Sequence, residues 1–242
     1  MNTSSRTTSA AVNELRYGDL TTLDGATELT FTMWARPEAV AGRLFGKYSA
    51  GSWSFLWYHW GVPTRTTLLV TDGSNQEEWL SPAAYDAVNI YKWNFLSVSW
   101  KAGTPSTCKM YVNDTEFTPT KGAPNITSIA NSTVDFALFG SNAASTNYFG
   151  RAANIHVYDR QLSAAEIASV KATPKAVTTN LVHYFALDDS PDWSDSWGSA
   201  GNATVVGTVS AELDGPYRNR GASTLYKAVP MVRAQLDRKS VV

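Results

Sequence analysis

The chain has 242 residues, of which 43% are hydrophobic and 17% charged, and its formal net charge at neutral pH is −1. This length suits one domain with a sizeable core. The balanced charge excludes a global field that attracts nucleic acid or an anionic membrane. No segment approaches the roughly 20 apolar residues needed to cross a bilayer. We therefore expect neither a nucleic-acid nor a membrane partner.

The first residues and the single cysteine bear on where the protein acts. Residues 1–11 are rich in Ser and Thr, which predicts a flexible N-terminal arm, and they lack the apolar core of a secretory signal. Cys108 has no partner in the chain, so an intrachain disulfide is excluded. Because it lies in an alternating segment, we expect Cys108 to be a small buried hydrophobic residue.

The next segments read mostly as strands, followed by one short helix. In residues 92–100, Leu96, Val98 and Trp100 alternate with smaller or opposite-facing residues, which is the pattern of a half-buried strand. Residues 108–114 repeat the pattern and end at an Asn-Asp turn. Residues 163–166 read Ser-Ala-Ala-Glu, which has the form of a capping box and predicts a helix over 163–171.

Five segments in this order resemble the laminin G-like, or concanavalin A-like lectin/glucanase, domain in its pentraxin-like microbial branch. The segments are 28–37, 44–48, 92–100, 110–114 and 149–163. The resemblance runs from about Glu14 to Val170. It implies an all-β fold: an antiparallel two-sheet β-sandwich with jelly-roll topology, about a dozen strands and one short helix.

A sixth segment stands in an unusual place. Residues 181–188, followed by 198–207, look like the strand and Gly-Asn turn that often precede such a domain. Here they follow it. They either close the sandwich as an extra edge strand or are the remnant of a second copy.

The chain divides into an N-terminal arm (1–11), a sandwich (12–217) and a basic C-terminal arm (218–242). The last arm carries six basic residues against one acidic residue, Asp237. The basic residues are Arg218, Arg220, Lys227, Arg233, Arg238 and Lys239. Apolar residues recur among them, which predicts an assembly arm that lies on another surface, either its own sandwich or a partner chain.

Catalytic patterns are scarce. Glucanases of this fold place catalytic carboxylates at alternate positions of one strand, because period 2 aims them into the same cleft. The chain has no such spacing, and its one close glutamate pair, Glu77-Glu78, points to opposite faces of a strand. His59, His156 and His183 are far apart and predicted to be structural. We expect no catalytic residues; a hydrolase or lyase is the alternative ranked last.

Calcium is the one ion that the resemblance suggests, because relatives commonly bind it. No other cofactor is required. The densest acidic group is Asp188, Asp189, Asp192 and Asp195. Hard cations favour such oxygen arrays, but Asp-rich turns are usually only solvated. Asp72 with Asn75, or Asp114 beside Asn113, are alternative positions.

An aromatic cluster is the predicted binding surface for carbohydrate or a partner. Its candidate residues are Trp53, Trp57, His59, Trp60 and Trp79. In an extended strand both faces of residues 53–60 are aromatic, so one face supplies core. The other either stacks on sugar rings or is covered by the tail or a neighbouring protomer.

Two function classes remain. The first is a noncatalytic structural or attachment module of a virus particle, such as a bacteriophage capsid decoration or tail/fibre protein, because the resemblance includes such proteins. It would be made in the host cytoplasm and would assemble through its arms with other virion proteins or its own copies. The alternative is a carbohydrate-binding, lectin-like module whose partner is a surface glycan.

Overall fold

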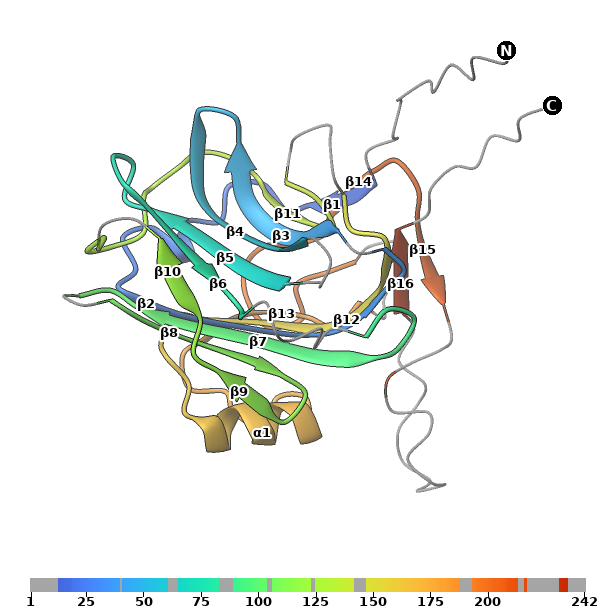
Figure 1. Ribbon diagram of the computed structural model, residues 1–242. Helices are drawn as coiled ribbons and strands as arrows, with labels where there is room; N and C mark the ends of the chain where they lie inside the picture. Colours follow the sequence, from blue (N-terminus) through green and yellow to red (C-terminus); the bar gives the residue numbers. More distant parts are fainter. Residues whose placement is uncertain are drawn as a thin grey trace, which may run out of the picture.

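Two antiparallel sheets lie face to face and form a β-sandwich in the computed structural model (Figure 1). The structure describes residues 13–39, 41–60, 65–82, 89–103, 106–122, 125–141, 147–187, 193–212, 216 and 231–234. The predicted all-β sandwich is confirmed. The described strands number sixteen rather than about a dozen, because strands of three residues are too short to show an alternating pattern.

Each sheet has eight strands. In spatial order, sheet A consists of β10 (Thr120–Gly122), β6 (Gln76–Leu80), β5 (Arg65–Thr71), β4 (Ser52–Trp60), β3 (Gly42–Ser49), β11 (Phe136–Leu138), β1 (Glu14–Arg16) and β14 (Thr204–Val206). Sheet B consists of β15 (Val209–Glu212), β16 (Met231–Ala234), β12 (Gly150–Tyr158), β2 (Glu28–Pro37), β7 (Asn94–Lys101), β8 (Thr107–Val112) and β9 (Thr115–Phe117), with β13 (Leu181–Phe185) also paired to β12.

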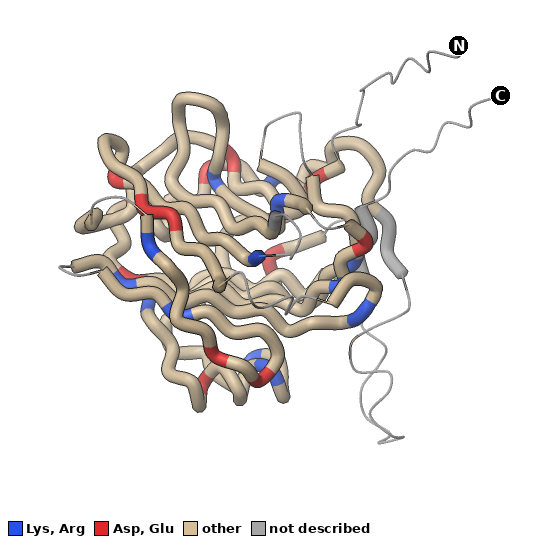
Figure 2. The backbone as a smooth tube through the Cα atoms, in the orientation of Figure 1, with Lys and Arg blue, Asp and Glu red and all other residues tan. Residues whose placement is uncertain are grey.

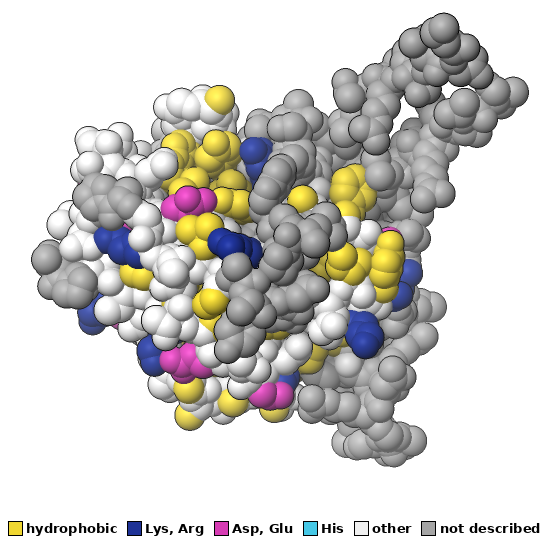
Figure 3. Space-filling model, viewed as in Figure 1, with side chains coloured by type: hydrophobic (Ala, Val, Ile, Leu, Met, Phe, Trp, Pro, Cys, Tyr) yellow, Lys and Arg dark blue, Asp and Glu magenta, His cyan; other side chains and the backbone are white. Residues whose placement is uncertain are grey.

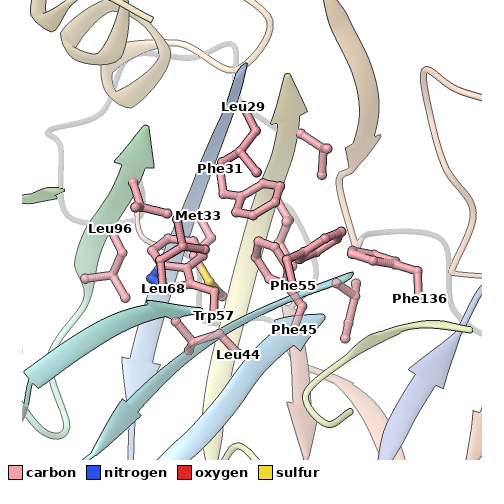
Figure 4. Close-up of a cluster of buried hydrophobic side chains, with 14 of the residues drawn as sticks. Leu29, Phe31, Met33, Leu44, Phe45, Phe55, Trp57, Leu68, Leu96 and Phe136 are labelled. Carbon is pink, nitrogen blue, oxygen red and sulfur yellow. The ribbon is translucent and has the colours of Figure 1, made fainter. Parts of the chain in front are cut away.

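Aromatic rings from both sheets fill the space between them (Figure 4). Phe31 of β2 meets Phe45 of β3 at 5.0 Å between ring centroids, and Phe45 meets Trp57 of β4 at 5.3 Å. All three rings are fully buried. The edge-to-face pair of Phe31 and Phe45 joins sheet B to sheet A.

A second apolar cluster covers the other face of sheet B. The helix α1 (Ala164–Ala172) lies on the side of sheet B away from sheet A (Figure 1). Its Ile167 and Val170 pack in a buried cluster with Phe95 of β7. The strand predicted over 92–100 is therefore β7, but it is buried on both faces rather than on one. Only Lys101 at its end is exposed.

The predicted helix begins as expected. The side chain of Ser163 accepts a hydrogen bond from the amide of Glu166, and the Glu166 carboxylate accepts one from the amide of Ser163 at 2.8 Å. A hydrogen bond from Arg160, together with those from Ser163, lowers the pKa of Glu166 to about 2. Cys108 is buried as predicted, and its burial raises its pKa well above the ordinary value.

The sixth segment belongs to this sandwich. Strand β13 pairs with β12, and β14 pairs with the first strand, β1. The first of the two alternatives is therefore correct: these residues extend both sheets at their edges. A neighbouring copy of the domain is not needed to explain them.

The C-terminal arm also contributes a strand. Strand β16 pairs with β15 and with Gly150–Ala152 of β12. Arg233 lies on β16, opposite Arg151. Arg218, Arg220, Lys227, Arg238 and Lys239, like residues 1–11, lie outside the described residues. Of the two surfaces proposed for the arm, β16 occupies the chain's own sandwich and is part of sheet B.

A buried carboxylate joins the two sheets. Glu77 of β6 is fully buried. It accepts hydrogen bonds from Trp79 Nε1 at 2.9 Å, Trp100 Nε1 at 2.9 Å, Ser106 Oγ at 2.6 Å and the amide of Ile126 at 2.7 Å. Burial by itself raises the pKa of Glu77, but these hydrogen bonds outweigh it and lower the pKa. Since Trp100 is on sheet B, the carboxylate ties β6 to β7.

We predict that Glu77→Gln lowers the free energy of unfolding by about 2–4 kcal/mol, because an amide offers one oxygen and adds donors where the indoles already donate. Urea unfolding at neutral pH measures the change. The matched control is Glu78→Gln on the same strand, for which we expect less than about 1 kcal/mol. Equal losses in the two variants would contradict the role assigned to Glu77.

Candidate functional site

The outer face of sheet A is not covered by α1. The outer face of sheet B is occupied by α1 and its apolar cluster. In Figure 3, hydrophobic side chains gather over the part of the molecule where Figure 1 places β3, β4 and β5, with charged side chains among them. Elsewhere, acidic and basic residues are interspersed along the chain (Figure 2). The outer face of sheet A therefore carries the candidate site.

A groove of about 230 Å³ lies on this face, and we call it the outer groove. Its lining residues are Gly42, Arg43, Tyr48, Leu56, Tyr58, His59 and Leu69. They come from the neighbouring strands β3, β4 and β5. A groove of this size suits a small polar ligand rather than a folded partner.

A bulge between β3 and β4 decides which side chains reach the groove. Arg43 pairs with Tyr58 and Phe45 pairs with Trp57, so Leu44 is the extra residue. Leu44 and Phe45 consequently both reach the core (Figure 4), while Arg43 stays on the outer face. Gly46 of β3 lets the backbones of β3 and β4 approach closely. A Cβ there would lie 2.6 Å from the carbonyl oxygen of Phe55.

Arg43 supplies a positive charge in the groove. Its guanidinium carbon lies 5.0 Å from the centroid of the Tyr48 ring, and its Nη1 donates a hydrogen bond to Ser141 Oγ. Burial lowers the pKa of Arg43, against the nearby Tyr48 and Glu14. The guanidinium is therefore held in a fixed position on an aromatic ring.

Tyr58 links the groove to an acceptor. Its hydroxyl donates to Glu78 Oε1 at 2.8 Å. Burial and this hydrogen bond raise the pKa of Tyr58 far above its ordinary value, so the hydroxyl stays protonated. Glu78 is on β6, three strand spacings from Arg43 on β3, which is about 14 Å. A cation and a carboxylate thus stand at opposite sides of an aromatic and aliphatic floor.

Most of the predicted aromatic cluster is interior, which corrects the sequence interpretation. Trp57, His59 and Trp79 are buried, and burial lowers the pKa of His59 to about 4. Trp57 and Trp79 belong to the central core, so they cannot stack on a sugar from solvent. Trp53 is half-buried, and its ring packs on Tyr48 at 5.7 Å. The side chain of Trp60 lies outside the described part.

Arg43, Tyr48 and Glu78 were not predicted from the sequence to be neighbours at one site. The alternation of side chains could have revealed part of the site. Leu68 and Trp79 point into the core, so their sequence neighbours Leu69 and Glu78 point outward from β5 and β6. Glu77 and Glu78 face opposite sides of the sheet, as predicted. Glu77 nevertheless has a structural role, because its carboxylate joins the two sheets.

A second polar constellation lies away from the groove. His183 Nδ1 is 2.6 Å from Asp195 Oδ2, and its Nε2 is 2.7 Å from Thr22 Oγ1. This order of hydroxyl, imidazole and carboxylate is that of acyl-transfer triads. The cavity beside it holds only about 10 Å³, which is less than an acyl substrate needs. The arrangement instead ties Thr22, in a short 3-10 helix, to β13.

Asp195 organises the loop that follows β13. Its carboxylate also accepts hydrogen bonds from the amides of Tyr184, Trp197, Gly198 and Ala200. Burial by itself raises the pKa of Asp195, but the hydrogen bonds from His183 and the amides lower it to about 2. This carboxylate is committed to the loop, and Asp188, Asp189 and Asp192 lie outside the described residues.

The alternative calcium positions are also engaged. Asp72 accepts hydrogen bonds from the amides of Ser74 and Asn75, which is ordinary turn chemistry, and Asp114 pairs with Lys171 at 2.6 Å. In the described ranges, no group of three or more His, Cys, Asp or Glu side chains is arranged to hold a metal. Calcium binding stays a prediction of the sequence.

A lysine takes the place that a cation prefers. The Lys47 ammonium is buried and lies 2.6 Å from Asp19 Oδ1, 2.9 Å from the carbonyl of Leu20 and 3.1 Å from Asp24 Oδ1. Two carboxylates and a carbonyl are the ligand types of a hard cation. Here the chain fills this oxygen cage with its own charge.

Comparison with known proteins agrees with this architecture. A family model described as the concanavalin A-like lectin/glucanases superfamily matches residues 8–168. The chain belongs to this superfamily. The resemblance to this superfamily, predicted from five segments, is thereby confirmed. The match to the superfamily ends inside α1, so β13 to β16 extend the sandwich beyond it. A search of curated proteins found no match.

Solved structures of the superfamily fold are similar at low identity. One is the native heptameric SAP-like pentraxin from Limulus polyphemus, with 15% identity, 66% of this chain and 76% of that chain covered, and a TM-score of 0.51. Another is a putative carbohydrate binding protein from Bacteroides ovatus, with 13% identity, 82% and 57% covered, and a TM-score of 0.54. The chain thus spans little more than half of the second protein. At these identities the likeness shows the fold alone.

A third similar structure is the enzymatically active domain of tailspike protein 2 from bacteriophage CBA120. Its identity is 15%, the match covers 73% of this chain and 28% of that chain, and the TM-score is 0.41. A score this low carries no argument about role. Within the described residues, no helix is both long and apolar enough to cross a membrane.

We predict that Asp195 contributes stability that depends on pH. Its folded pKa of about 2 lies below the ordinary value of 3.8, so the contribution is full above about pH 4 and is lost as the pH falls towards 2. Asp195→Asn should lower the free energy of unfolding by about 2 kcal/mol at pH 7. The difference from the unmodified chain should shrink below about pH 4.

Urea unfolding at several pH values measures this difference. The matched control is Asp114→Asn, because the Asp114 side chain is 85% exposed and its ion pair with Lys171 is a surface one. We expect the control to change little at any pH. A difference for Asp195→Asn that stays constant from pH 7 to about pH 2 would contradict the predicted linkage.

Proposed function

We propose that the chain is a noncatalytic carbohydrate-binding module that holds a saccharide in the outer groove. The observation that carries this proposal is the groove itself, in which half-buried aromatic and aliphatic side chains adjoin a guanidinium and a carboxylate. A pyranose presents an apolar C–H face and a rim of hydroxyls, so it needs both kinds of contact at once.

The chemistry of the groove supports binding over hydrolysis. Glycosidases use two carboxyl groups about 5–10 Å apart across the bond that is cleaved. Next to the outer groove, Glu78 is the carboxylate in hydrogen-bond contact with a lining residue, while Glu77 on the same strand is enclosed in the core. One carboxylate that already accepts from Tyr58 does not supply an acid and base pair.

Membership of a superfamily named for lectins and glucanases supports the same proposal, as does the fold shared with a putative carbohydrate binding protein. The narrower role in a bacteriophage or other virus particle stays a prediction of the sequence, as does assembly with virion proteins or with its own copies. Glycan binding and virion attachment are compatible, because attachment to a cell surface requires a ligand on that surface.

The test is a glycan array probed with the full chain, followed by calorimetric titration of the saccharides that bind. The variant Leu69→Trp places a large ring in the groove from a half-buried position of β5. We expect it to weaken binding by at least about tenfold, because the ring occupies the space of the saccharide.

The matched control is Leu80→Trp on β6, which is half-buried and does not line the groove. Thermal melting of both variants checks that the fold is kept. We expect Leu80→Trp to bind saccharides as the unmodified chain does. If no saccharide on the array binds, or if Leu69→Trp binds as well as Leu80→Trp, the outer groove is not a carbohydrate site.

A further inference from the structure

Arg43 is a half-buried positive charge that lines the outer groove. A guanidinium has five N–H donors, and burying it is costly unless these donors and the charge are compensated. Arg43 is half-buried, and its Nη1 donates to Ser141, which is fully buried. Among the residues that the structure describes, no carboxylate forms an ion pair with Arg43, and no acceptor contacts its Nε or Nη2.

Two other buried or half-buried cations have a carboxylate as a partner. Lys47 is enclosed by Asp19 and Asp24, and Lys121 lies 3.3 Å from the Glu77 carboxylate. The acid whose charge favours the protonated form of Arg43 is Glu14, and Glu14 already forms an ion pair with Arg16. The fold therefore leaves the charge of Arg43 directed at the groove.

The geometry of Arg43 suits a planar anion. With Nη1 bound to Ser141 and one face of the guanidinium over Tyr48, the remaining edge consists of Nε and Nη2. Two parallel N–H groups along one edge of a guanidinium match the two oxygens of a carboxylate. The contacts with Ser141 and Tyr48 hold this edge in place before any ligand arrives, which reduces the entropy lost on binding.

The side of the groove away from Arg43 is next to a carboxylate, that of Glu78 on β6. Glu78 accepts the hydroxyl proton of Tyr58 and retains further lone pairs, so it can accept from ligand hydroxyls. Strand β6, which carries Glu78, lies three strand spacings or about 14 Å from β3, which carries Arg43, so the repulsion between Glu78 and an anion bound at Arg43 is weak in solvent. The groove and its surroundings are thus complementary to a saccharide with a carboxylate at one end and hydroxyls at the other.

We propose that the ligand of the outer groove is a carboxylated saccharide, of the uronic acid or sialic acid type, whose carboxylate binds the Nε and Nη2 edge of Arg43. This inference rests on the proposed function, since it names the class of saccharide that the same groove accepts. The leucine and tyrosine side chains contact the ring, and Glu78 accepts its hydroxyls.

The experiment compares matched saccharides that differ in the carboxylate alone. Glucuronic acid is titrated against glucose, and sialylated lactose against lactose, with the full chain and with Arg43→Gln and Arg43→Lys. We expect Arg43→Gln to weaken binding of the acidic saccharides by about 10- to 100-fold, because the charge and the fork are both lost. Arg43→Lys should bind the acidic saccharides more weakly than the unmodified chain and more tightly than Arg43→Gln. Lysine keeps the charge but lacks the two parallel N–H groups of the guanidinium.

Two controls separate local from general effects. Lys109→Gln removes one positive charge from an exposed position on sheet B and should leave binding unchanged. A tenfold rise in salt should weaken the acidic saccharides more than the neutral ones. Thermal melting of every variant verifies folding, and Arg43→Lys keeps the test decisive if Arg43→Gln is unstable.

The outcomes distinguish this inference from the proposed function. If acidic and neutral saccharides bind equally well, or if Arg43→Gln weakens both alike, the groove binds carbohydrate but the inference is wrong. Binding of sulfated saccharides in place of carboxylated ones would overturn it as well. If no saccharide binds, the proposed function fails first, and this inference fails with it.

Discussion

The carboxylate of Glu77 is the interaction on which the arrangement of the two sheets depends. It is a charge inside an aromatic core, and it is tolerated because indole, hydroxyl and amide donors surround it. Trp79 belongs to sheet A and Trp100 to sheet B, so one group specifies how the sheets are stacked. Apolar packing favours contact between two sheets, whereas directed hydrogen bonds select a single register of that contact.

The stacking in turn decides which surface is available for binding. Once β6 and β7 are joined through Glu77, sheet B faces the core on one side and α1 on the other. Sheet A faces the core on one side, and its other side carries the outer groove. The position of the helix therefore leaves the outer groove on the other sheet, and the helix contributes no residue to that groove.

The treatment of charge follows the same division. Interior charges are neutralised within the fold: Glu77 by its donors and Lys121, and Lys47 by two aspartates. Arg43 is held by contacts with Ser141 and Tyr48 that fix its position without neutralising it. A guanidinium that the fold positions but does not neutralise can bind an anionic group of a ligand. This difference between Arg43 and the interior charges is the reason for proposing a carboxylated saccharide.

Local patterns in the sequence were sufficient for the strand β7, for the capped helix α1 and for the burial of Cys108, because each depends on neighbours within a few residues. The order of segments was also sufficient for the superfamily. Alternation alone did not tell which face of residues 53–60 meets solvent, since both faces are aromatic. The bulge at Leu44 and the pairing of β3 with β4 settled that, and they sent Trp57 inward and Arg43 outward. The donors around Glu77 come from positions as far as 49 residues away in the chain, so only the tertiary structure unites them.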